Sequence, residues 1–217
     1  MNLIRRMNTL LLSFLVLLMF SPQTFAHPHS FIDMETTLIT ENQTLTGIEY
    51  VWKMDPMTSA DILYDLMNTK EDSPQWKKQA ASVMANIIAQ SYFSELNYQN
   101  KKQPLKLFPD TYRMTREGLQ IVMSFRVLLL HPIPLTGSTI ELKTYEPTFF
   151  VSMTYNGKRA VHLSPPDASQ CRLIFTEADP SDTLKDYALS LDTGDTSDDD
   201  LTLGRQFAQQ ITLHCPE

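Results

Sequence analysis

Hydrophobic and polar residues alternate over two early runs of the chain, which a polar turn separates. The first run, residues 30–38, places Ile32, Met34 and Leu38 on one face, with Phe31, Asp33, Glu35 and Thr37 on the other. The second run, residues 48–54, alternates Ile48, Tyr50, Trp52 and Met54 with Glu49, Val51 and Lys53. Side chains of a strand point alternately to its two faces, so each run predicts a half-buried strand. With the turn at residues 41–44, the two runs predict a β-hairpin.

The spacing of apolar residues becomes helical after Asp55-Pro56. A short helix is predicted over residues 58–67, with one apolar face made of Ala60, Leu63, Tyr64 and Met67. Ser73-Pro74 has the composition of an N-cap followed by proline at the first helical position. A long amphipathic helix is therefore predicted from residue 74 to about residue 95. Its core-facing side chains are Trp76, Ala80, Val83, Met84, Ile87 and Ile88.

The rest of the chain predicts mostly strands. They cover residues 119–129, 140–145, 148–155, 159–163 and 171–176. Asn156-Gly157 predicts a hairpin turn between the third and fourth of these strands. Residues 179–200 are polar and acidic, and residues 201–213 predict a final helix that packs Leu203, Phe207 and Ile211. We therefore expect an α+β domain over residues 27–217, with a mainly antiparallel sheet, one long helix and a few short helices.

Residues 1–26 have the three parts of a cleavable signal peptide. Arg5 and Arg6 precede an apolar run, and Thr24 and Ala26 are the small residues that a signal peptidase requires. The apolar run is about a dozen residues, well short of the roughly 20 that a spanning helix needs. The alternative is an uncleaved N-terminal anchor. We expect cleavage after Ala26 and a periplasmic protein that begins at His27.

Removal of the signal peptide makes an acidic chain more acidic. The sequence has 18 basic and 25 acidic residues, and the signal peptide contains two of the basic ones, so the net charge of the mature chain is −9. A chain of this charge without a basic patch argues against nucleic acid and anionic membrane surfaces as partners. It is better suited to cations.

Both cysteines, Cys171 and Cys215, lie in the exported part of the chain. In an oxidising compartment an even pair predicts a disulfide, which here closes a loop of about 45 residues. Loop entropy assigns such a bridge roughly 4 kcal/mol. A metal site or a redox pair is the alternative, and neither has its usual CxxC spacing.

The start of the predicted mature chain, His27-Pro28-His29, is the candidate metal site. In an extended chain, residues two apart point the same way and their Cα atoms are about 6–7 Å apart, so both imidazoles reach one ion. Asp33 lies about 13 Å beyond His29, so a third ligand has to come from elsewhere. Imidazole ligands suit zinc, and also nickel, cobalt or copper. The alternative is an exposed chain end that binds nothing.

Two copper motifs use residues at these positions. The amino-terminal motif with histidine in third place needs the amide N–H of residue two, which Pro28 lacks. A histidine brace, in which the amine and ring of His27 chelate copper, requires only cleavage after Ala26. The acidic stretch lacks the spacing of a calcium-binding EF-hand, which favours a solvated loop. No hydrolase or P-loop signature occurs, so we expect no enzyme activity.

Four segments along the chain resemble one known family. They are His27-Pro28-His29-Ser30-Phe31-Ile32-Asp33, Leu45-Thr46-Gly47-Ile48 with Trp52, Tyr145-Glu146-Pro147-Thr148-Phe149-Phe150-Val151, and a late cysteine after a Pro-rich loop. Together they resemble uncharacterised bacterial periplasmic proteins that are described as components of an ABC-type transport system. Genes for members commonly lie beside inner-membrane permeases of the nickel/cobalt type, and some members are implicated in zinc transport. Many members have an Asp/Gly-rich, calcium-like loop between two helices, whereas residues 68–73 here are short and contain no glycine.

The resemblance implies a periplasmic accessory protein that binds or delivers a transition metal to an inner-membrane permease, with zinc first and nickel or cobalt next. His27 and His29 are the expected ligands. The alternatives are a structural partner subunit of the permease with no metal of its own, and a copper histidine-brace protein.

Overall fold

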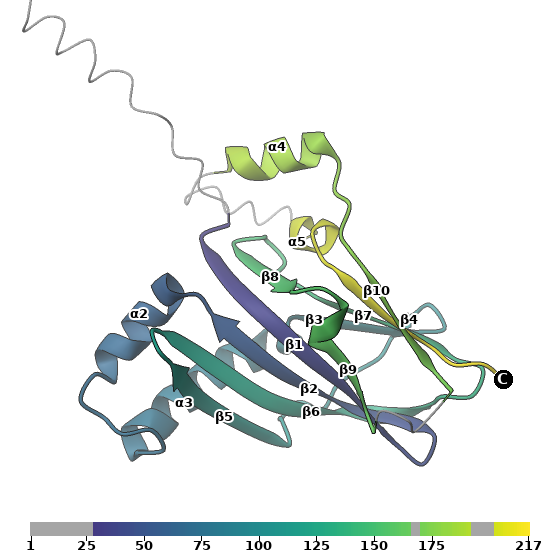
Figure 1. The fold of residues 1–217 in the computed structure, drawn as a ribbon, viewed down its shortest axis with the longest axis horizontal. Helices are drawn as coiled ribbons and strands as arrows, with labels where there is room; N and C mark the ends of the chain where they lie inside the picture. Colours follow the sequence, from purple (N-terminus) through teal and green to yellow (C-terminus); the bar gives the residue numbers. More distant parts are fainter. Residues whose placement is uncertain (1–27, 166–169, 192–201) are drawn as a thin grey trace, which may run out of the picture.

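Two mainly antiparallel sheets and a few helices make up the α+β fold (Figure 1). The structure is a computed structural model, and it describes residues 28–165, 170–191 and 202–217. The predicted signal peptide and His27 lie outside these ranges and stay predictions. No helix in the described ranges is long and apolar enough to cross a membrane.

The first sheet contains the predicted hairpin at its centre. Its strand order is β5 (Thr111–Glu117), β6 (Gln120–Pro134), β2 (Thr44–Met54), β1 (Ser30–Glu41) and β8 (Val151–Tyr155). The strands β1 and β2 pair antiparallel, with Met34 opposite Trp52, and Asn42 and Gln43 turn the chain with positive φ angles. Apolar and polar side chains of β1 alternate between buried and exposed positions as the sequence predicts.

The strands that pair with the outer edge of β1 differ from the predicted hairpin across Asn156-Gly157. Both β8 and β9 (Val161–Ser164) pair parallel with β1, through Ser30 opposite Val151 and Thr36 opposite Val161. The predicted hairpin across Asn156-Gly157 is therefore wrong. A short 3₁₀ turn, η2 (Lys158–Ala160), follows Gly157, and the chain then continues along the same edge of the sheet.

The second sheet contains the C-terminal segment, where another prediction is wrong. Its order is β10 (Arg172–Thr176), β11 (Gln210–His214), β7 (Thr139–Thr144), β3 (Ser94–Tyr98) and β4 (Lys101–Lys102). The predicted final helix is only the short α5 (Leu203–Gln206), and β11 follows it. Ile211 and Leu213 are buried in β11 and alternate with less buried neighbours, which is the period of a strand.

The helices differ from their predictions in length and orientation. The longest described helix, α3 (Pro74–Ala89), buries Trp76, Ala80, Met84 and Ile87 as predicted. It stops well before residue 95, because residues 91–93 have positive φ angles and β3 begins at Ser94. The acidic stretch, predicted as a solvated loop, contains α4 (Asp182–Ser190).

The helix α2 (Pro56–Asp65) turns a different face inward from the one predicted. Ser59 is fully buried, and its hydroxyl accepts a hydrogen bond of 2.9 Å from the N–H of Ile121 in β6. Of the predicted inner residues, Leu63 packs against the core, whereas Tyr64 and Met67 are 74% and 63% exposed. The contact at Ser59, which apolar spacing does not detect, sets the rotation of the helix.

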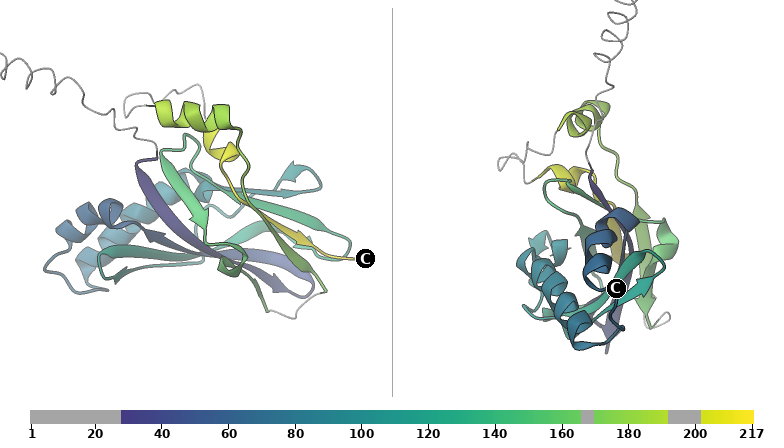
Figure 2. Two further views of the ribbon diagram at one scale, coloured as in Figure 1. Left: turned by 45° about the horizontal axis from the view of Figure 1, so that its top comes forward. Right: turned by 90° about the vertical axis from the view of Figure 1, so that its left-hand side faces the viewer.

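The buried core lies between the two sheets and under α3. Figure 2 shows the two sheets and α3 from two further sides. Tyr50, Trp52 and Phe125 form an aromatic cluster with ring centroids 4.8–5.7 Å apart. The Tyr50 hydroxyl forms a hydrogen bond of 2.8 Å with Ser94 of the second sheet, and burial raises the pKa of that phenol. Because a buried hydroxyl needs a partner, this bond links the two sheets inside the core.

Candidate metal-binding chain end and its supporting loop

His29, the described member of the predicted histidine pair, is held at the start of β1. Its backbone N–H donates a hydrogen bond of 3.0 Å to the carbonyl of Phe150. Its ring lies 4.7 Å from the ring of Phe150, at an angle of 38° between the planes, and the side chain is half-buried. This imidazole therefore belongs to a packed part of the domain. The geometry of His27 relative to it stays a prediction.

The loop that holds His29 is residues 145–150, between β7 and β8, and Glu146 organises it. The Glu146 carboxylate accepts hydrogen bonds from the N–H and hydroxyl of Thr148, at 3.1 and 2.8 Å, and from the N–H of Phe150 at 2.8 Å. Such bonds satisfy backbone donors that no strand partner reaches. Glu146 thus acts as an internal cap of this loop, and both of its carboxylate oxygens accept hydrogen bonds within it.

The short helix α5 supports the same loop from behind. The N–H of Gly204 donates a bond of 2.8 Å to the carbonyl of Pro147. A Cβ on Gly204 would lie 1.8 Å from the carbonyl oxygen of Glu146, so only glycine allows this approach. The rings of Phe149 and Phe207 stack with centroids 4.0 Å apart. Loop and helix therefore form one packed unit.

An ion pair joins this unit to the second sheet. The guanidinium of Arg205 donates two bonds of 2.9 Å to the carboxylate of Glu95 in β3, which also accepts a bond of 2.7 Å from the hydroxyl of Tyr145. Arg205 is the main cause that lowers the pKa of Glu95 to about 2. Burial and this carboxylate raise the pKa of Tyr145 to about 12. Glu95 is thus ionised at neutral pH, and its carboxylate anchors α5.

Asp55 fixes the other side of the chain end, and sequence reasoning missed its role. Its carboxylate caps α2 by accepting bonds from the N–H groups of Met57 and Thr58, at 2.8 and 3.0 Å, and it also accepts the N–H of Phe31 at 2.8 Å. Burial acts to raise its pKa, but the bonds from Thr58 and Phe31 lower it below its ordinary value. The Asp55-Pro56 pair was the available signal, because Asp at the N-cap followed by proline is typical of a helix start.

The described residues do not form a closed metal site. No three His, Cys, Asp or Glu side chains in these ranges lie close enough together to hold an ion. Of the other histidines, His131 and His162 are exposed on β6 and β9. Asp33 is also exposed, and it lines a hollow with Glu35 and Lys53, to which His29 does not contribute. A structural zinc site needs four protein ligands, and the described residues do not supply such a set.

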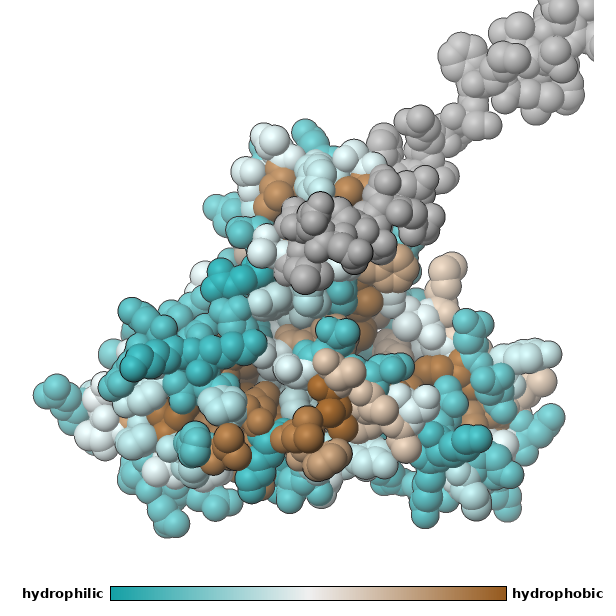
Figure 3. Space-filling view, turned by 180° about the vertical axis from the view of Figure 1, so that it is seen from behind, coloured by the Kyte–Doolittle hydropathy of each residue, from teal (hydrophilic) through white to brown (hydrophobic). Residues whose placement is uncertain are grey.

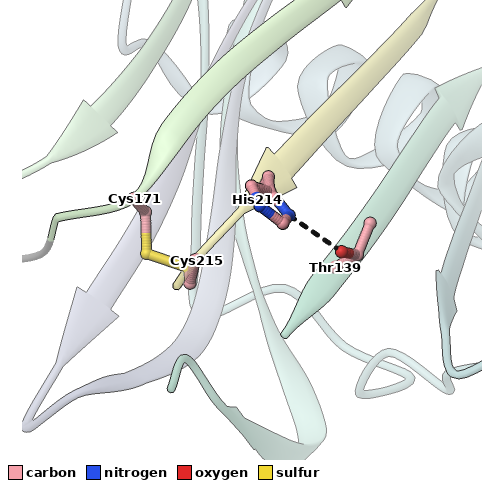
Figure 4. The surroundings of a disulfide bond; sticks show 4 residues. All are labelled: Thr139, Cys171, His214 and Cys215. Carbon is pink, nitrogen blue, oxygen red and sulfur yellow. Dashed lines mark hydrogen bonds between the residues drawn. A yellow bond between two sulfur atoms is a disulfide. The ribbon is translucent and has the colours of Figure 1, made fainter. Parts of the chain in front are cut away.

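The predicted disulfide between Cys171 and Cys215 is confirmed (Figure 4). It joins the residue before β10 to the residue after β11, and the neighbouring His214 ring forms a hydrogen bond of 3.1 Å with Thr139. Both sulfurs are bonded to each other, so neither is a metal ligand. A disulfide is compatible with an exported protein.

A cavity of about 390 Å³ at the end of α3 has a different character from the chain end. It is lined by apolar side chains, by uncharged polar residues such as Ser91 and Gln103, and by Lys102 and Lys106, and none of its lining residues is a histidine or an acid. In the space-filling view of the whole molecule from behind, patches of apolar side chains lie between the hydrophilic ones (Figure 3). This cavity therefore offers no metal donors.

Comparison with known proteins places nearly the whole chain in one family. The model of the family described as "Protein of unknown function (DUF1007)" matches residues 12–215. An uncharacterized protein of Haemophilus influenzae is 38% identical over 204 residues, which are 94% of this chain and 98% of that protein. A match of this length includes both sheets, the supporting loop and both cysteines. The chain therefore belongs to the DUF1007 family.

Proposed function

We propose that this protein is a periplasmic accessory protein that binds a transition metal at its N-terminal histidine pair and delivers it to an inner-membrane transporter. The anchored position of His29 is the observation that carries the proposal. Backbone bonding and ring packing against Phe150 hold this imidazole at the point where the chain enters the domain. His27, two residues earlier, would add a second ring and the terminal amine.

An incomplete ligand set suits delivery better than storage. Zinc prefers four ligands, and the chain end offers two imidazoles and one amine at most. An ion held in this way keeps an open position where a ligand of the transporter can attack. Zinc is the first candidate cargo, and nickel or cobalt is the next, because all three accept neutral imidazole.

Isothermal titration of the mature protein with zinc tests this proposal. We expect binding that the His27→Ala/His29→Ala variant loses. The matched control is His131→Ala/His162→Ala, which removes the same number of imidazoles from exposed positions elsewhere. Equal affinity in wild type and in the His27/His29 variant would rule out these ligands.

A metal-free partner subunit of the transporter is the second candidate. The exposed apolar side of α2, with Met57 and Tyr64 at 81% and 74% exposure, favours a role in protein contact. This candidate predicts that the protein co-purifies with an inner-membrane protein while elemental analysis finds no metal.

A further inference from the structure

The helix α2 carries apolar side chains on two opposite sides. Its inner side packs Ile62 and Leu63 against the core, next to the buried Ser59 and, just after the helix ends, Leu66. Its outer side carries Met57, Ala60, Tyr64 and, just after the helix ends, Met67. These positions are three, four and three residues apart, so they lie on one face of a helix. We call them the α2 outer face.

The α2 outer face exposes large apolar side chains to solvent, although such side chains are usually buried. Met57, Tyr64 and Met67 are 81%, 74% and 63% exposed. Figures 1 and 2 show α2 at the margin of the molecule, so neither sheet covers its outer side. A helix that is apolar on opposite sides is typical of one buried on both. Contiguous exposed apolar side chains, methionines among them, are typical of contact surfaces.

Acidic residues border this face and restrict what can cover it. Asp61 and Asp65 are exposed along one flank of the α2 outer face, and neither forms an ion pair within the described ranges. A membrane of anionic lipids would be repelled by this flank. Two copies of the chain that packed α2 antiparallel across a two-fold axis would place these aspartates opposite each other, because such an interface uses the same patch twice. Charge complementarity thus favours a different partner with a basic flank.

We propose that the α2 outer face binds a partner protein through an apolar helix flanked by lysine or arginine. Apolar contacts of Met57, Tyr64 and Met67 supply the binding, and Asp61 and Asp65 orient the partner helix. The hydrogen bond between Asp55 and Phe31 ties the first turn of α2 to the start of β1, so the bound partner would lie near the chain end. The inference deepens the second candidate function by naming the chemistry of the partner, and it does not depend on metal binding.

Two synthetic helical peptides test this surface. They share one leucine stripe, and lysine flanks it in the first and glutamate in the second. Fluorescence anisotropy with the mature protein should show the lysine peptide binding at least tenfold more tightly than the glutamate peptide. The variant Asp61→Lys/Asp65→Lys should reverse this order. No binding of either peptide, or equal binding of both, would overturn the proposal.

A pair of triple variants locates the site. Met57→Ser/Tyr64→Ser/Met67→Ser should weaken the lysine peptide at least tenfold. The matched control, Leu107→Ser/Phe108→Ser/Leu119→Ser, removes side chains that are 65%, 71% and 67% exposed elsewhere, and it should leave the affinity within twofold. All six positions are exposed, so unchanged thermal melting is the check that both variants fold.

Two further results would overturn the proposed occupant. Self-association in sedimentation velocity that the Met57/Tyr64/Met67 variant abolishes would identify the partner as a second copy. Binding to phosphatidylcholine vesicles that the same variant abolishes would identify a lipid surface. The proposal predicts a monomer that does not bind these vesicles.

Discussion

Replacement of Gly204 by alanine is a direct test of how α5 supports the loop under His29. The new Cβ would lie 1.8 Å from the carbonyl oxygen of Glu146, where no real structure tolerates a carbon. The two backbones must separate by at least about 1.6 Å before ordinary van der Waals contact is restored. That movement lengthens the bond from Gly204 to the Pro147 carbonyl and disturbs the stack of Phe149 on Phe207.

The expected loss of stability for Gly204→Ala is the sum of three effects. Overpacking costs about 1–3 kcal/mol, the backbone hydrogen bond about 1 kcal/mol and the ring stack up to about 1 kcal/mol. We therefore expect a loss of about 3 kcal/mol in the free energy of unfolding. For a domain of this size that corresponds to a fall of roughly 6–12 °C in Tm.

Urea denaturation followed by far-UV circular dichroism measures this loss. Gly118→Ala is the control, because its Cβ would meet nothing within 4 Å and only the positive φ of 62° opposes it. We expect that control to lose about 1 kcal/mol. If Gly204→Ala were no less stable than Gly118→Ala, the close approach of α5 to the loop would be refuted.

Three further substitutions test the ion pair, the disulfide and the seat of α2. The pKa of Glu95 is lowered to about 2, mainly by Arg205, so its stabilisation is full above the unfolded pKa near 4.5 and is lost as pH falls toward 2. Since Arg205 is half-exposed, we expect Glu95→Gln to lower the free energy of unfolding by about 1–2 kcal/mol at pH 7 and by much less near pH 2. Urea titrations at both pH values measure this loss, and a loss that is the same at both would contradict an origin in the ion pair. Cys171→Ser/Cys215→Ser opens a loop of sequence separation 44 and should lower the free energy of unfolding by about 4 kcal/mol, whereas an unchanged urea midpoint would show that the unfolded chain is already restrained. Ser59→Ala leaves a buried backbone N–H of β6 without its acceptor and should cost about 1–3 kcal/mol in the same assay, and a neutral result would contradict the orientation of α2.

Local periodicity predicted the elements whose environment is set by near neighbours in the chain. The hairpin of β1 and β2 and the inner face of α3 are confirmed, because each buries one side against a continuous core. The disulfide was predicted from the export signal and the even cysteine count, without any geometric information, and the structure confirms it.

Long-range pairing explains the failures. Leu203, Phe207 and Ile211 have helical spacing, but β11 lies between β10 and β7, and those partners come from elsewhere in the sequence. The parallel pairing of β8 and β9 with β1 likewise depends on a strand more than 100 residues away. Ala60, Tyr64 and Met67 of the α2 outer face were predicted as core, because periodicity reports an apolar side of a helix but not what covers it.

The candidate site likewise combines features that the local sequence predicts with features that depend on long-range contacts. The histidine pair and its spacing can be identified from the sequence, because their chemistry lies in residue type and position. The loop that holds His29 cannot, since its shape depends on Gly204 and on an ion pair between Glu95 and Arg205, 110 residues apart. The Asp55-Pro56 pair also marks a helix start in the sequence, but only its capping chemistry, and not the apolar periodicity, identifies it.

Nuclear magnetic resonance of the histidine side chains during a zinc titration is the most direct test of metal binding at the chain end. The protein must begin at His27, and its five histidines give separate imidazole signals. The proposed function predicts that the signals of His27 and His29 shift together and saturate near one equivalent of zinc, while those of His131, His162 and His214 stay in place. Zinc-induced shifts at these three histidines alone, or none at any histidine, would contradict it.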